Sequence, residues 1–210
     1  ADLTQVGAWA YSEHPSTDVI CACYALPGDS IIRSWVPGDQ PPVLLFLAME
    51  QGHTVEAHNL SFEFSMWHNV LGPRYGWPIP RMDQWRDSMA AACYYAMPAA
   101  LDRLARALGY EGKDAEGGRL ITKYSKLHLK TAKPEIPAED LEKFVAYCRK
   151  DVQIEQSISD ELGPLPDREL PVFQLDLEMN HRGLLLDREG IAAATEIVER
   201  RAEELTAEFR

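Results

Sequence analysis

The stretch TVEAHNLSFE, residues 54–63, is typical of a short β-strand that turns directly into a helix. The strand is expected over residues 54–58, a polar turn at Asn59, and a helical pattern from Leu60 onward. Asn59 and Glu63 stand at i and i+4, which would place both on one face of the new helix. The Glu63 carboxylate would then project near the carboxyl end of a strand, where open α/β sheets place their sites. Taken alone, the residues favour a simpler interpretation, in which Asn59 caps the helix and Glu63 is solvated.

The residues before this stretch predict a β-hairpin followed by a helix. Residues 18–26 and 30–36 are rich in β-branched and aromatic side chains, and a Pro-Gly-Asp turn signal separates them. Two prolines then suit the first turn of a helix over residues 41–51, which ends at Gly52. Strands followed by strand–helix alternation predict an α/β fold with a mixed sheet. The chain opens on a turn-like segment, residues 1–3, as a sheet that lacks its first strand would.

The remainder is predicted to be mainly helical and to contain one domain boundary. Helices are expected over residues 60–71, 87–97, 99–108, 137–163, 169–181 and 187–210, with loops over 72–80 and 113–118. The first of these helices is expected to stop at Gly72-Pro73. Residues 163–167 (GPLPD) have the composition of a linker, so the chain should divide there.

A second candidate for chemistry lies on the long helix expected over residues 137–163. Tyr147 and Asp151 stand at i and i+4 beside its apolar stripe, and therefore share a face. A phenol in that position can orient a water molecule, and a carboxylate can hold a metal ion. The simpler interpretation is a half-buried tyrosine beside a solvated aspartate, and these two residues alone favour it.

Together and in this order, the two motifs resemble the second and third motifs of the DEDD exonucleases, which have an RNase H-like fold. Tyr147 four residues before Asp151 resembles the tyrosine subclass, since the histidine subclass would carry His where Ala146 stands. Further segments resemble phage-type family A DNA polymerases, namely residues 2–3, 7, 11, 87–89, 99–102, 108–109, 113 and 118–121. The tail resembles the start of a polymerase region at residues 170–172, 178, 182–183 and 186–187. Many members of the family have Asp at the position of Glu63, although phage-type members often carry Glu.

The resemblance implies a 3′→5′ proofreading exonuclease domain over residues 1–163 and the start of a polymerase domain over residues 168–210. It implies two divalent ions, Mg²⁺ or Mn²⁺, and release of nucleoside 5′-monophosphates from a 3′ end. The site residues that it implies are Asp151 and Glu63 as metal ligands and catalytic groups, Tyr147 to orient the attacking water, and Asn59, His58 and Phe62 toward the substrate strand. The family's first motif, a D-x-E on the first strand, has no counterpart here, so we expect this chain alone to have little nuclease activity.

The net charge, the cysteines and the apolar content of the chain limit what it is expected to bind and where it is expected to act. The formal net charge of −12 is unusual for a nucleic-acid binder, because Lys and Arg contacts to phosphate supply most of that affinity. We therefore expect the chain to bind a single-stranded 3′ end or primer-template only with basic surface from the remainder of a polymerase chain. Four cysteines without CxxC spacing favour small buried residues in a reducing compartment. No apolar run approaches the ~20 residues that cross a bilayer, so we expect no membrane and a cytoplasmic location in a bacterial or phage-infected cell.

Three other functions remain open on the sequence. A ribonuclease D-like RNA 3′ exonuclease shares the DEDD pattern with tyrosine, although the polymerase-like tail argues against it. An exonuclease-like module without catalysis could position a primer strand. A globular interaction domain could carry both motifs by chance.

Overall fold

The computed structural model describes residues 2–110, 115–125 and 135–209. The chain divides into two compact units, Ala1–Gln174 and Leu175–Arg210. The first unit contains strands and helices, so the expected α/β class is confirmed in this coarse sense. Within the part of the chain that is described, no helix is both long and apolar enough to span a membrane.

The expected hairpin is present in the first unit. Strands β1 (Ala22–Ala25) and β2 (Ile32–Trp35) pair antiparallel, in a register that places Cys23 opposite Ser34. The Pro-Gly-Asp turn closes it, because Gly28 adopts φ 70° and the Asp29 carboxylate accepts a hydrogen bond from the N–H of Ile31 (2.8 Å). Local turn chemistry is thus sufficient to position this pair of strands.

A second pair of strands forms between distant segments. Helix α2 (Val43–Glu50) begins after Pro42, as expected, and leads to strand β3 (Val55–Ala57). β3 pairs in parallel with β4 (Trp85–Asp87), a strand that sequence patterns did not predict. β4 is only three residues long and follows a short 3₁₀-helix, η2 (Met82–Gln84), so it carries little periodic signal of its own.

The helix expected over residues 60–71 is longer and less regular than predicted. It comprises α3 (Ser61–Met66), a π-helical turn η1 (Trp67–Leu71) and α4 (Gly72–Tyr75). The predicted stop at Gly72-Pro73 is therefore wrong. Pro73 is accommodated where the chain passes from the π-helical turn into α4, because the π-helical turn changes the hydrogen-bonding register just before it. Gly76, with φ 69°, ends the helix instead.

The start of the chain also differs from the expectation. Residues 3–13 form a helix, α1 (Leu3–Glu13), which Asp2 caps by accepting a hydrogen bond from the N–H of Thr4 (3.0 Å). Asp2 and Leu3 are thus the cap and the first residue of a helix rather than a turn. Gly7 interrupts this helix with a non-helical φ of 78°.

Three of the later helices follow the prediction more closely, namely α5 (Ser88–Tyr94), α6 (Leu101–Ala107) and the long α8 (Ala138–Leu162). Helix α7 (Ala115–Tyr124) was not predicted. Of the loop expected over residues 113–118, positions 113 and 114 lie outside the described residues. Residues 115–118 begin α7, so the loop prediction is wrong there.

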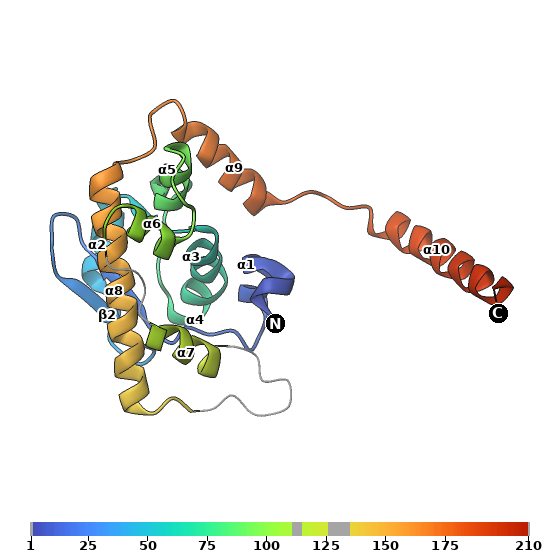
Figure 1. Cartoon of the computed structure of the whole chain (residues 1–210), viewed down its shortest axis with the longest axis horizontal. Coiled ribbons are helices and arrows are strands. Elements are labelled where there is room, and N and C mark those ends of the chain that lie inside the picture. Colours follow the sequence, from blue (N-terminus) through green and yellow to red (C-terminus); the bar gives the residue numbers. More distant parts are fainter. Residues whose placement is uncertain (1, 111–114, 126–134, 210) are drawn as a thin grey trace. The chain divides into compact units, whose positions relative to one another are not determined.

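Helix α8 organises the first unit (Figure 1). Near its start, Phe144 packs with Leu120 and Tyr124 of α7. Its central turns lie against β1, and its last turns bury Ile154 and Ile158 among α5 and α6. A cluster of buried aromatic rings joins the other elements: Trp35, Trp67, Trp77 and Trp85. The central turns of α8 are thereby held opposite the strands.

Two helices make up the end of the chain. Helix α9 (Leu170–Arg182) runs across the division between the units and ends at Gly183, as predicted. Helix α10 (Arg188–Glu208) is capped by Asp187, whose carboxylate accepts a hydrogen bond from the N–H of Gly190 (2.9 Å). The functional division expected at residues 163–167 stays a prediction, since compactness divides the chain after Gln174.

Candidate functional site

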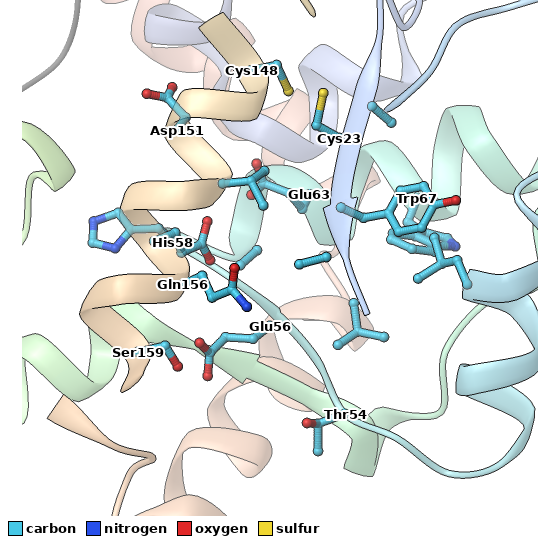
Figure 2. A pocket seen from close by; sticks show the side chains of 18 of the residues that line it. Cys23, Thr54, Glu56, His58, Glu63, Trp67, Cys148, Asp151, Gln156 and Ser159 are labelled. Carbon is cyan, nitrogen blue, oxygen red and sulfur yellow. The ribbon is translucent and has the colours of Figure 1, made fainter. Parts of the chain in front are cut away.

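A cavity of about 1140 Å³ lies in the first unit, between strand β1, strand β3 and helix α8 (Figure 2). All residues of β1 and of β3 line it, and α3 supplies a further wall. The two strands are not hydrogen-bonded to each other anywhere in the described ranges. The cavity therefore separates the edges of two small sheets.

The cavity brings together the two predicted motifs, which are far apart in the sequence. Glu63, in the first turn of α3, and Asp151, in the middle of α8, both line it. Asn59, His58 and Phe62 also line it. Five of the six predicted site residues thus border one space.

Tyr147 is the exception among the predicted site residues. It is half-buried on α8, one turn before Asp151, and is not among the residues that line the cavity. The i, i+4 spacing does place Tyr147 and Asp151 on the same side of the helix.

The turn between β3 and α3 is built around Asp87 rather than around Asn59. The buried Asp87 carboxylate accepts hydrogen bonds from the N–H groups of Asn59 (3.0 Å), Leu60 (3.1 Å) and Met89 (2.8 Å). Asn59 precedes the helix with φ 65°, so the predictions that it caps α3 and shares a helical face with Glu63 are wrong. The physical reason is that one carboxylate at the end of β4 satisfies the open N–H groups of α3 and of α5 together.

His58 is fixed by protein groups on both ring nitrogens. Its Nε2 lies 2.8 Å from the carbonyl oxygen of Ala99, and its Nδ1 lies 3.1 Å from Oγ of Ser88. A carbonyl can only accept, so Nε2 carries a proton, and in the neutral ring Nδ1 accepts from the Ser88 hydroxyl. His58 thereby ties the end of β3 to α5 and to the segment before α6.

Phe62 connects the cavity wall to the first helix. Its ring lies 6.3 Å from the ring of Tyr11, centroid to centroid, with the planes tilted by 34°. This range is typical of attractive aromatic pairs. Helix α1 thus supports the turn of α3 that carries Phe62 and Glu63.

Sequence reasoning missed three carboxylates that share the cavity, Glu56 of β3 and Glu155 and Asp160 of α8. Burial raises the pKa of Glu155 well above its ordinary value, and negative charges on neighbouring carboxylates raise it further: those of Glu63, Glu56, Asp87 and Asp151. Burial also raises the pKa of Glu56. The signal for Glu155 was available, because it stands four residues after Asp151 and so continues the same helical face.

The donor set at this cavity suits a hard divalent cation only in part. Carboxylate oxygens are the ligands that Mg²⁺ and Mn²⁺ prefer, and a cation would offset the crowding that raises the pKa of Glu155. Across the described portion of the chain, however, no group of three or more His, Cys, Asp or Glu side chains is arranged to hold a metal ion. The carboxylates described here therefore form an incomplete set.

A DNA polymerase of Bacillus phage SP02 is 28% identical to this chain over 200 residues, which cover 89% of the chain and 30% of that polymerase. The chain thus spans less than a third of the relative that it matches. No protein-family model and no solved structure matches the chain. The similarity shows that this chain is related to a phage DNA polymerase.

Proposed function

We propose that this chain is the 3′→5′ proofreading exonuclease portion of a phage-type family A DNA polymerase, with an RNase H-like fold over residues 1–163 and the start of a polymerase domain over 168–210. One observation carries the proposal: Glu63 and Asp151, from the second and third motifs, border the same acidic cavity. The relationship to a phage polymerase supports the same assignment.

The space between β1 and β3 supports the RNase H-like part of the proposal. Both strands border the cavity along their whole length, and neither is paired with the other in the described residues. Neighbouring strands of a sheet lie about 4.8 Å apart, so one inserted strand could join two such edges into one mixed sheet. A strand that carries the D-x-E motif would bring two further carboxylates to Glu63 and Asp151.

In the proposed reaction, the phosphodiester at the 3′ end of a single strand or primer is hydrolysed and a nucleoside 5′-monophosphate leaves. Asp151 and Glu63 would hold Mg²⁺ or Mn²⁺ together with the first-motif carboxylates. Divalent ions bound there supply an activated water and stabilise charge at the leaving oxygen. Tyr147 would orient that water, while Asn59, His58 and Phe62 border the path of the substrate strand.

The acidic character of the chain defines what else the reaction needs. With a net charge of −12, this chain offers little electrostatic attraction to DNA, so the basic surface would come from the remainder of the polymerase. We place the reaction in the cytoplasm of a bacterial or phage-infected cell, where such a polymerase would act.

The test uses the full-length polymerase that contains this chain, with 5′-labelled single-stranded DNA and Mg²⁺. Asp151→Asn should lower the release of mononucleotides by about 10³-fold, because it removes a charged metal ligand. Glu142→Gln on the same helix is the matched control, since Glu142 is exposed and does not line the cavity. Equal activity of the Asp151→Asn variant and the wild type would refute the nuclease assignment.

A second candidate is an exonuclease-like module that positions the primer without cleaving it. The incomplete set of metal ligands among the described residues favours it. If the full-length wild type binds a primer 3′ end but releases no nucleotide with Mg²⁺ or Mn²⁺, this second function is correct. A preference for RNA over DNA in the same assay would indicate the ribonuclease D-like alternative.

A further inference from the structure

Helix α2 is apolar on almost every side. Its sequence is VLLFLAME, so Glu50 is its only charged residue. Surface helices of soluble proteins carry polar residues on the side that faces solvent, whereas a helix that is apolar all round is normally buried. The composition of α2 therefore indicates that more than one of its sides is covered in the functional protein.

The first unit covers two sides of this helix. Leu45 and Met49 are buried and line the cavity. The ring of Phe46 packs edge-on against the ring of Trp77, with the centroids 5.5 Å apart and the planes at 70°. These contacts hold α2 in place and account for three of its apolar side chains.

The remaining side of α2 is apolar and exposed. Val43, Leu44 and Leu47 are 57%, 53% and 44% exposed. Leu47 stands three residues after Leu44 and four after Val43, so the three side chains are neighbours on the helix surface. Single exposed apolar side chains are normal, whereas contiguous apolar patches mark interaction sites. These three residues are called the outer face of α2 below.

The outer face points away from the cavity. Leu47 is two residues from both Leu45 and Met49, which corresponds to about 200° around the helix axis. A partner that covers the outer face would therefore leave the cavity open to a substrate strand. It would also restrain the cavity wall, because Leu45 and Met49 belong to the same helix.

The size of the outer face favours a partner in the same polypeptide over a second molecule. A stable interface between separate proteins buries about 800 Å² on each partner and involves roughly 20 residues a side, so three side chains are too few. A partner attached to the same chain has a high effective concentration, and a small apolar surface then suffices. A polymerase contains such a partner, since this chain corresponds to only 30% of the related phage polymerase.

We propose that the outer face of α2 is the surface on which the polymerase region C-terminal to Arg210 packs in the full-length protein. This inference rests on the proposed function, because it requires that a polymerase region belongs to the same polypeptide. The partner surface is apolar where it covers Val43, Leu44 and Leu47.

The experiment uses the full-length polymerase that contains this chain, with a photoreactive amino acid on the outer face as Leu47→p-benzoylphenylalanine. After irradiation, tryptic peptides are analysed by mass spectrometry. The expected product joins the peptide of residues 34–74 to a peptide C-terminal to Arg210, and it migrates as a monomer on a denaturing gel. Gln153→p-benzoylphenylalanine is the control and should not give this product, since Gln153 is exposed on α8 and does not line the cavity.

A second variant measures how much the contact contributes. Leu44→Gln together with Leu47→Gln makes the outer face polar at similar helix propensity, and the first unit keeps its packing because both side chains are exposed in it. Amide hydrogen exchange over residues 43–50 of the full-length polymerase should become at least about tenfold faster, because α2 loses its apolar cover. Ile121→Gln removes an exposed apolar side chain on α7 and should leave that exchange unchanged.

Three results would overturn the proposal. A cross-link between two molecules would identify a second copy as the partner. Cross-links confined to residues 1–210, or none at all, would show that no polymerase region packs on α2, and so would an unchanged exchange rate in the double variant. The nuclease assignment fails separately, through the activity of Asp151→Asn, because neither cross-linking nor hydrogen exchange depends on catalysis.

Discussion

The β3–α3 turn and helix α8 both border the cavity, and they use carboxylates in opposite ways, although Asp87 itself does not line it. At the end of β4, the single carboxylate of Asp87 accepts three backbone N–H groups and holds the β3–α3 turn and α5 together. On α8, Glu155 is placed among other carboxylates and its pKa is raised by burial and by their charge. The first carboxylate is electrostatically satisfied and the second is not. Strongly perturbed pKa values cluster at functional sites, whereas a carboxylate that accepts several backbone N–H groups has a structural role.

The largest expected effect on stability comes from removing the Asp87 carboxylate. Asp87→Ala leaves three N–H groups without an acceptor, one of them the buried N–H of Leu60. Because hydrogen bonds to a charged acceptor are strong, we expect the free energy of unfolding to fall by about 3 kcal/mol, measured by urea denaturation.

The control for Asp87 is Asp83, four residues earlier, whose carboxylate is exposed and forms an ion pair with Arg81. Asp83→Ala should leave the urea midpoint unchanged, since exposed ion pairs contribute little. If both substitutions leave the midpoint unchanged, the Asp87 carboxylate does not hold the turn. Asp87 and Glu155 would then not differ in the way described above.

The second effect concerns Glu155 on α8, where a substitution should raise the free energy of unfolding instead of lowering it. The pKa of Glu155 is higher in the folded chain than its ordinary value of 4.5, so the folded state binds more protons in the window just above pH 4.5. Stability from this group is therefore lost as pH rises through that window. Glu155→Gln should raise the free energy of unfolding at pH 8 by on the order of 1 to 2 kcal/mol, and the gain should vanish below about pH 4.5.

A matched substitution on the same helix sharpens this result. Glu142→Gln removes an exposed carboxylate away from the cavity, and should change stability equally little at both pH values. A gain for Glu155→Gln that is the same at pH 4 and pH 8 would show that the effect comes from packing and not from charge.

The structural features that follow from local sequence were predicted, and those that depend on distant segments were not. The hairpin of β1 and β2 and the long helix α8 follow from turn residues and periodicity, which are local. Strand β4 was missed because its pairing with β3 depends on a distant segment. Asp87 was assigned no structural role for the same reason, since its three partners lie on two other elements.

The candidate site was predicted only in part, and by a different route. Glu63 and Asp151 were paired through the order of two motifs, and their convergence on one cavity is a tertiary property that neither motif contains. Glu56 was not found, because no spacing rule joins a residue of a short strand to a distant helix. Local sequence patterns thus predict most of the helices and strands, whereas long-range packing decides which side chains meet at the site.

The smallest effect concerns Asn59, whose backbone N–H donates to the Asp87 carboxylate. Its φ of 65° is left-handed, a conformation that asparagine tolerates better than alanine. Its N–H bonds to Asp87 whatever its side chain, so Asn59→Ala tests the backbone preference together with one exposed hydrogen bond from Ser61. Asn59→Ala should cost about 1 kcal/mol of unfolding free energy, and Asn59→Gly should cost less, because glycine adopts this φ freely. Ser61→Ala removes the same hydrogen bond and leaves the turn intact. An equal loss for Asn59→Ala and Ser61→Ala would mean that the left-handed turn contributes nothing and that Asp87 alone holds this segment.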